Sequence, residues 1–358
     1  MNQYKKRPRR KPSPLVKRTA FVLLLAILII SVAQCTKSCT KNKNTAAEQS
    51  KFAAKTVNTK QSANDVIPGG QLLRYAQRTD ETKSLKVDSN YGILINLDSM
   101  SVVADKKGDD RIYPASMTKV MTLIVAVENL KDLNETFTFT NELIDPLVNE
   151  EASRAGFDPD ETVPVTDLLY GTVLPSGADA TSALAIVVAG GEREFVKLMN
   201  KKANEMGLMN THFMNASGLH DEYHYSTCHE MALILNYAMQ NELCAKILSA
   251  VQYTTTKTPQ HPDGIELYST MFSRMYGNEA VGVTIKAGKT GYTNEGGNCL
   301  VSYAIKDSDG TRYILATAHA SGQWKPTYDA IHAYAKYVGT GEENIQPEGT
   351  QDPGTVYY

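Results

Sequence analysis

Residues 113–122 read Tyr-Pro-Ala-Ser-Met-Thr-Lys-Val-Met-Thr and run directly into the apolar segment Leu123–Val127. Pro114 suits the first position of a helix, where its missing N–H costs nothing. The stretch therefore predicts a helix on which Ser116 and Lys119 share one face. A serine in the first helical turn, with an amine in reach, can act as an activated nucleophile. The same four-letter pattern also fits a capping serine on a surface helix, so this stretch alone does not identify Ser116 as a nucleophile.

The composition favours a globular protein whose charge is unevenly distributed. The chain has 358 residues and is 42% apolar, which is enough for a large core. Residues 1–18 carry eight Lys or Arg and no acidic residue, whereas the remainder holds 29 basic and 39 acidic residues. A body with a net charge of −10 lacks the clustered basic side chains that phosphate contacts need. We therefore expect no nucleic-acid partner.

The N-terminal segment has the pattern of an export signal. The basic leader, residues 1–18, precedes a mainly apolar segment of fifteen residues at 19–33. As a helix these would span about 22 Å, less than the roughly 30 Å hydrocarbon core of a membrane. That length is typical of a signal peptide or a short membrane anchor. We expect export, followed either by cleavage after a small-x-small site or by retention in the membrane. Residues 34–74 are polar and predict a disordered linker.

The folded body is expected over residues 75–340, with a disordered tail at 341–358. Its hydrophobic periodicity predicts strands near both ends and helices between them, which favours an antiparallel sheet closed by the two ends of the body. The predicted strands are 91–97, 101–104, 137–139, 281–285, 299–305 and 313–319. The predicted helices are 166–173, 179–188, 193–206, 227–239 and a closing helix at 328–338.

Three short motifs follow one another: S-M-T-K at 116–119, S-G-A at 176–178 and K-T-G at 289–291. An S-x-x-K motif with a later S-x-N-type triplet and K-T-G is the signature of penicillin-binding proteins and class A β-lactamases. With the flanking text, including residues 215–227, the chain resembles the serine-type D-alanyl-D-alanine carboxypeptidases of the low-molecular-mass penicillin-binding group. The resemblance implies an α+β fold of the β-lactamase/DD-peptidase type, an antiparallel sheet flanked by helices with a helical subdomain.

The resemblance also implies catalytic roles. Ser116 matches the family nucleophile, and Lys119 matches its general base. Such a base needs an amine pKa lowered by burial and by a nearby cation, which Lys289 could supply. Ser176 matches the serine that relays a proton towards the leaving nitrogen.

The third motif matches the groups that bind substrate. Lys289 and Thr290 correspond to the residues that hold the substrate's terminal carboxylate. Gly291 has no side chain, so we expect its strand to approach the substrate closely. By analogy the oxyanion hole combines the backbone N–H groups of Ser116 and Tyr292.

Two positions depart from the family pattern. The middle triplet usually ends in Asn, whose amide helps to orient the substrate backbone, but here Ala178 stands in its place. A lost side-chain donor could cost a few kcal/mol if nothing replaces it. Many relatives also carry an Arg after the last strand, near the substrate carboxylate. Residues 321–325 read Ser-Gly-Gln-Trp-Lys, which makes Lys325 a candidate replacement.

The sequence thus predicts removal of the terminal D-alanine from peptidoglycan stem peptides through an acyl-enzyme on Ser116, outside the cytoplasmic membrane, with β-lactams as inhibitors. One alternative is a penicillin-binding wall sensor with impaired catalysis, which Ala178 would suit. Another is a β-lactamase, although no E-x-x-L-N-like stretch lies between Ser176 and Lys289 to supply its second base. The motifs do not separate carboxypeptidase from endopeptidase or transpeptidase activity.

Other motifs in the chain favour no different chemistry. A P-loop ending at Lys289 would need Gly at position 283, which is Val. His220 and His224 imitate a metal pair, but Asp follows the first of them where zincins have Glu, so both read as polar loop residues. Five scattered cysteines do not form a disulfide framework or a C-x-x-C site: Cys35, Cys39, Cys228, Cys244 and Cys299. We expect no metal and no cofactor.

Overall fold

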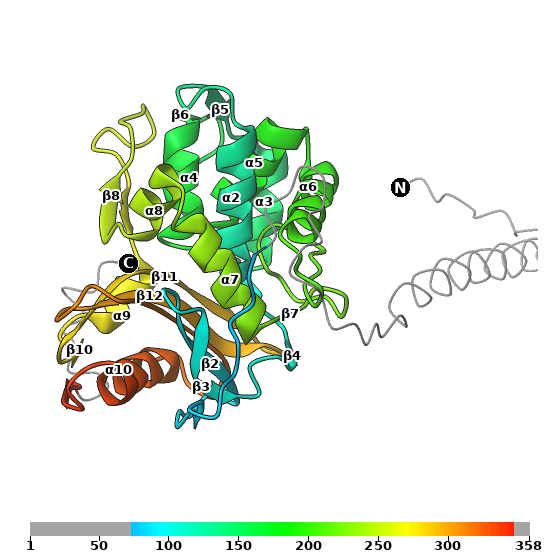
Figure 1. Cartoon of the computed structure of the whole chain (residues 1–358). Coiled ribbons are helices and arrows are strands. Elements are labelled where there is room, and N and C mark those ends of the chain that lie inside the picture. Colours follow the sequence, from blue (N-terminus) through cyan, green and yellow to red (C-terminus); the bar gives the residue numbers. More distant parts are fainter. Residues whose placement is uncertain (1–72, 347–358) are drawn as a thin grey trace, which may run out of the picture. The chain divides into compact units, whose positions relative to one another are not determined.

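The computed structural model describes residues 73–346 (Figure 1). The predicted leader, the apolar segment, nearly all of the predicted linker and the end of the predicted tail lie outside these residues. Within residues 73–346 there is no helix both long and apolar enough to cross a membrane.

One eight-stranded sheet forms the centre of the body, and the strand order is β1-β3-β2-β13-β12-β11-β10-β14. Strand β2, near the N-terminal end of the body, pairs antiparallel with β13 near its C-terminal end, so the two ends of the body meet in one sheet, as predicted. All pairings are antiparallel except that of β1 with β3. The bounds are β1 Lys83–Ser84, β2 Tyr91–Asn96, β3 Ser101–Lys106, β10 Glu279–Ala280, β11 Val283–Thr293, β12 Gly297–Lys306, β13 Arg312–Ala320 and β14 Glu343–Asn344.

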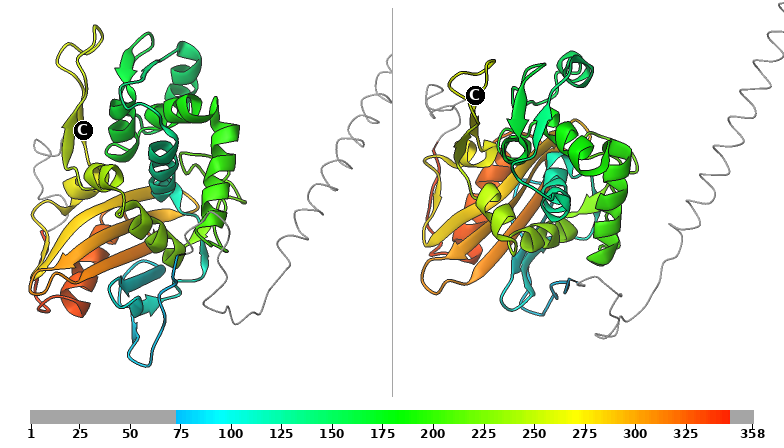
Figure 2. Two further views of the ribbon diagram at one scale, coloured as in Figure 1. Left: turned by 45° about the horizontal axis from the view of Figure 1, so that its top comes forward. Right: turned by 90° about the horizontal axis from the view of Figure 1, so that it is seen from above.

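Helices cover both faces of this sheet, because its strands bury apolar side chains on each side. The larger layer surrounds the buried helix α2, and α7 of this layer packs on β12 and β13. Figures 1 and 2 show α10 on the opposite face, where the short helix α9 joins it in a second apolar core. The larger layer comprises α2 Lys119–Asn129, α3 Asn141–Asn149, α4 Val165–Val173, α5 Ala178–Ala189, α6 Glu192–Glu205, α7 Cys228–Ala238 and α8 Glu242–Leu248; the smaller comprises α9 Thr270–Met275 and α10 Lys325–Tyr337.

Three small two-stranded sheets and one 3₁₀ turn complete the body. The turn, η1 Ala115–Thr118, stands directly before α2. The paired strands are β4 Arg111–Ile112 with β7 Ser226–Thr227, β5 Thr136–Thr138 with β6 Thr162–Pro164, and β8 Gln252–Thr254 with β9 Glu266–Tyr268.

The predicted helix start at Pro114 is wrong by one turn. Ala115 has a left-handed φ of 48°, which an α-helix cannot contain. The chain therefore forms the 3₁₀ turn η1 first, and the α-helix begins at Lys119. Ser116 lies in η1, one residue after the strained position.

The strand predicted at 281–285 begins later and is much longer. Gly282 turns the chain at a φ of 84°, and β11 then runs from Val283 through the whole K-T-G motif to Thr293. A bulge between Ile285 and Ala287 shifts its register on β12. The apolar run ends at Ile285, so periodicity alone did not extend this strand through the motif, although Gly291 was expected to lie on a strand.

The helix predicted at 227–239 is confirmed as α7 Cys228–Ala238, and Asn241 caps α8 as a separate helix. The three cysteines that the structure describes are free and buried. Residues Glu343–Asn344, assigned to the disordered tail, pair with β10 as the edge strand β14.

Candidate active site

The backbone at Ser116 is held from two sides by glycines. A Cβ on Gly291, in β11, would lie 2.9 Å from the Ser116 nitrogen and 3.0 Å from the Pro114 oxygen. A Cβ on Gly218, whose φ is 85°, would lie 2.0 Å from the Ala115 oxygen. The turn η1 is therefore packed between two other segments of backbone, which fix the position of the Ser116 N–H and Oγ.

Lys119 lies against the hydroxyl of Ser116. Its Nζ is 3.0 Å from Ser116 Oγ and donates to the backbone oxygen of Ser217 at 2.7 Å. The side chain is buried, and burial lowers the pKa of Lys119 to about 7, against a smaller opposing effect of Asp179. At neutral pH much of this amine is therefore unprotonated and able to accept the serine proton.

Lys289 is a second buried cation near the first. Only 1% of it is exposed, and its Nζ donates to the Thr290 oxygen at 3.1 Å. Burial and the positive charges of Lys119 and Arg274 together lower the pKa of Lys289 well below its ordinary value. The sequence predicted that Lys289 helps to lower the pKa of Lys119. In the structure burial is the main cause of the lowered pKa of Lys119, and the repulsion between the two lysines lowers the pKa of Lys289.

Ser176 occupies a strained position two residues before the start of α5. Its φ is 67°, in a region that residues with a Cβ seldom adopt. Its Oγ is buried and has no hydrogen-bond partner within residues 73–346. Strain and an unpartnered buried hydroxyl commonly mark functional positions, because the surroundings must hold them in place.

The motifs meet around η1 and β11. Gly291 touches Ser116 directly, as described above. The Thr290 hydroxyl is 2.6 Å from the Thr270 hydroxyl, and the Thr270 N–H donates to the Leu174 oxygen at 3.1 Å. Thr270 thus connects the K-T-G strand to the segment that carries Ser176. The seven predicted residues Ser116, Lys119, Ser176, Lys289, Thr290, Gly291 and Tyr292 consequently come from one region of the fold.

The geometry adds a detail at two of the predicted positions. The backbone of β11 at Gly291 lies against η1, so this strand approaches the nucleophile turn closely. Tyr292 presents an exposed side chain, 58% accessible, whose hydroxyl donates to Asn294 Oδ1 at 2.8 Å.

Lys325 is engaged elsewhere, whereas Arg274 lies near the site. Lys325 begins α10 and forms an ion pair with Asp88 at 2.5 Å. Arg274 projects from α9, one turn after Thr270, and its Nη1 donates to the Gln323 oxygen at 3.3 Å. Since its charge acts on Lys289, Arg274 is the better candidate for the missing arginine of the family pattern. The sequence reading missed it because no helix was predicted over residues 270–275.

The histidine pair is structural rather than metal-binding. His224 is buried, and its Nδ1 accepts the Met214 N–H at 3.2 Å, so Nε2 carries the proton and donates to Thr118 Oγ1 at 2.8 Å. Burial lowers the pKa of His224 to about 4. His220 stacks edge-on against Tyr113, with ring centroids 4.6 Å apart. In the part of the chain that the structure describes, no cluster of His, Cys, Asp and Glu could hold a metal.

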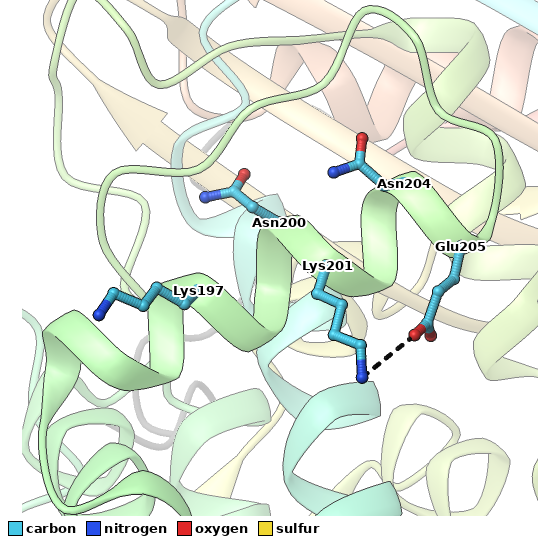
Figure 3. A pocket seen from close by; sticks show the side chains of 5 residues that line it. All are labelled: Lys197, Asn200, Lys201, Asn204 and Glu205. Carbon is cyan, nitrogen blue, oxygen red and sulfur yellow. Dashed lines mark ion pairs between the residues drawn. The ribbon is translucent and has the colours of Figure 1, made fainter.

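A surface pocket lies on α6 (Figure 3). It is lined by Lys197, Asn200, Lys201, Asn204 and Glu205, and Lys201 pairs with Glu205 at 3.5 Å. These side chains come from one exposed helix face and include no hydroxyl or thiol, so we do not assign the catalytic site to this pocket.

Comparison with known proteins identifies the family of the chain. The family model described as D-alanyl-D-alanine carboxypeptidase, of the peptidase S11 group, matches residues 77–321. The chain belongs to this family. The matched span contains all three motifs and the β2-to-β13 sheet, so the resemblance to serine-type DD-carboxypeptidases is confirmed.

Individual relatives of this family member are moderately similar. The D-alanyl-D-alanine carboxypeptidase DacF of Bacillus subtilis is 30% identical over 253 residues, which cover 69% of this chain and 63% of the relative. The DacA carboxypeptidase of Escherichia coli is 38% identical over 160 residues, 42% of this chain and 38% of its own length. The chain thus spans less than two thirds of either relative.

Solved structures show the same fold. The crystal structure of the Streptomyces K15 DD-transpeptidase superimposes with a TM-score of 0.64 at 27% identity, covering 71% of this chain and 98% of that one. The D-alanyl-D-alanine carboxypeptidase of Mycobacterium tuberculosis gives 0.60 at 27% identity and covers 74% and 94%. The predicted α+β fold of the DD-peptidase type is confirmed.

Proposed function

We propose that this chain removes the terminal D-alanine from peptidoglycan stem peptides that end in D-Ala-D-Ala. One observation carries the proposal: a buried lysine amine with a pKa of about 7 lies 3.0 Å from the hydroxyl of Ser116. Membership of the D-alanyl-D-alanine carboxypeptidase family supports the choice of substrate.

The reaction follows from these positions in two steps. Neutral Lys119 accepts the Ser116 proton while Oγ attacks the carbonyl of the penultimate D-alanine. The N–H groups of Ser116 and Tyr292 stabilise the oxyanion. Ser176 relays the proton held by Lys119 to the leaving nitrogen, so Lys119 is neutral again when the amine departs. Free D-alanine departs and leaves an ester on Ser116. Water, deprotonated by Lys119, then hydrolyses the ester and restores the serine.

The substrate carboxylate is assigned to the end of the site where positive charges gather. Lys289 and Arg274 repel one another there, and the Thr290 hydroxyl lies at the edge of β11 beside α9. A bound carboxylate relieves that repulsion and favours the protonated form of Lys289. The requirement for a free terminal carboxylate follows from this arrangement. Gly291 serves the same site by leaving room for η1.

We infer a location outside the cytoplasmic membrane, with peptidoglycan as the partner and β-lactams as inhibitors that acylate Ser116. The inference rests on the basic leader, on the mainly apolar segment at 19–33 and on the nature of the substrate. Residues 34–74 would then act as a linker between a signal sequence or anchor and a catalytic domain at 75–340.

Mass spectrometry of D-alanine release tests the proposal. Purified protein should release one D-alanine from a D-Ala-D-Ala pentapeptide, and a Ser116→Ala variant should not. The chain should also bind a fluorescent penicillin covalently at Ser116, which peptide mapping would locate. Wild-type protein that is not acylated contradicts the proposal, and acylation without release of D-alanine indicates the sensor alternative.

A second candidate is cleavage or formation of cross-links. It is favoured by the names of two similar proteins, the Streptomyces K15 DD-transpeptidase and the D-alanyl-D-alanine endopeptidase of Haemophilus influenzae. Incubation with a muropeptide digest separates the activities, because an endopeptidase cuts dimers to monomers whereas a carboxypeptidase shortens pentapeptides by one alanine.

A further inference from the structure

The position of Ala178 lacks any hydrogen-bond donor for a substrate. Its side chain has none, and its N–H already donates to the Ser153 oxygen at 2.7 Å. Ala178 is the residue that stands where the family pattern has an asparagine, two positions after Ser176. If the chain is a DD-peptidase, as proposed above, another group must contact the peptide there or this contact is lost.

The loop at residues 153–157 is fastened directly against this position. The buried carboxylate of Asp179 accepts the N–H of Ala155 at 2.8 Å, of Gly156 at 3.0 Å and of Phe157 at 3.4 Å. A Cβ on Gly177 would lie 2.7 Å from the Ala155 nitrogen, so the two backbones are in contact. A buried carboxylate with several backbone donors holds its loop rigidly, because its release would leave an unpaired charge.

Arg154 is the one cationic side chain on this fastened loop. The oxygen that accepts the Ala178 N–H belongs to the peptide bond between Ser153 and Arg154, so Arg154 begins beside Ala178. Its side chain is half-buried, and no hydrogen bond or ion pair joins it to any residue of the described part of the chain. A guanidinium offers five donors and is the residue best suited to bind a carbonyl or carboxylate oxygen in a partly desolvated site.

We propose that Arg154 is a substrate-binding residue that replaces the missing asparagine. Its guanidinium donates to the amide carbonyl on the acyl side of the scissile bond, that is, on the residue before D-Ala-D-Ala. The chain therefore selects peptides, and β-lactams, that carry an amide carbonyl at this position. This inference rests on the proposed function, since it assumes acylation of Ser116.

Acylation by two penicillins provides the test. Benzylpenicillin carries a side-chain amide carbonyl, whereas 6-aminopenicillanic acid has only an amine at that position. Arg154→Ala should lower the second-order acylation rate constant about tenfold or more for benzylpenicillin and change it less than about twofold for 6-aminopenicillanic acid. Arg154→Lys should fall between wild type and Arg154→Ala, because lysine keeps the charge but loses the forked donors.

A double-mutant cycle with Ala178→Asn distinguishes a substrate contact by Arg154 from a purely structural role. In the Ala178→Asn background the loss of Arg154 should cost about threefold or less, because the amide supplies the contact again. Arg193→Ala, on the exposed surface of α6, is the matched control. Equal losses for both penicillins, no loss for either, or a full loss in the Ala178→Asn background would overturn the inference. Wild type that neither compound acylates would overturn the proposed function as well.

Discussion

Replacing Gly291 by alanine should slow acylation of Ser116 by a factor of about 10² to 10³. The added Cβ would lie 2.9 Å from the Ser116 nitrogen, 3.0 Å from the Pro114 oxygen and 3.1 Å from the Ala115 Cβ. Since ordinary contact begins near 3.5 Å, η1 must move by roughly 0.6 Å. It cannot move freely, because the backbone at Gly218 also packs tightly against Ala115. The methyl group would cover the Ser116 N–H, and the loss of one oxyanion donor costs about 10² to 10³ in rate.

The assay for this variant is the second-order rate constant for a fluorescent penicillin, measured beside the thermal melting temperature. Gly322→Ala is the matched control, because its nearest neighbours would be Lys325 side-chain carbons at 3.6 Å or more. We expect the control to react at the wild-type rate. Acylation of Gly291→Ala within about threefold of wild type, with an unchanged melting temperature, would refute the argument that β11 positions the nucleophile turn.

Three other predictions follow from the buried titratable groups. Because acylation needs neutral Lys119, whose pKa is about 7, its rate constant should fall about tenfold per pH unit below pH 7 and level off above it; a flat profile from pH 5 to 8 contradicts this. The pKa of His224 is lowered to about 4, so the unfolded state binds more protons between about pH 6.5 and 4. The free energy of unfolding should therefore drop by about 3 kcal/mol as the pH falls through that range, and chemical denaturation of His224→Gln should show a smaller drop. Burial raises the pKa of Cys244 and Cys299 to about 12 and that of Cys228 well above its ordinary value, so iodoacetamide at pH 8 should label all three only after unfolding, as peptide mass spectrometry can show.

The parts of the fold that the sequence predicted are those with strong local signals. The strands at 91–97 and 313–319 are apolar runs bounded by turns, and the structure places them side by side in one sheet. The S-x-x-K and K-T-G motifs located the site because their residue types are tied to one chemistry. Local patterns of this kind do not depend on distant partners.

The remaining features depend on contacts that no local pattern reveals. Lys119 donates a hydrogen bond to the backbone oxygen of Ser217. In the sequence, residues 215–227 contributed to the family resemblance but did not predict this contact. Arg274 reaches the site through a six-residue helix that is too short to show periodicity. The sequence predicted that the pKa of Lys119 is lowered, but only the structure shows that burial of its side chain is the main cause. The sequence also did not reveal which residue could replace the donor that is missing at Ala178, because the loop at 153–157 that lies against it is distant in the chain.

Because β2 pairs with β13, the complete site can form only when the ribosome has nearly finished the folded body. Ser116 and Lys119 are translated early, yet Gly291, which fixes the nucleophile turn, and β13, which joins β2 to the sheet, come near the end of the body. Such long-range pairing slows folding and leaves incomplete chains with unpaired strand edges. A chain that stops before β13 would contain every residue of the three motifs and still lack the closed sheet. Reactivity towards penicillin would therefore report completion of the chain.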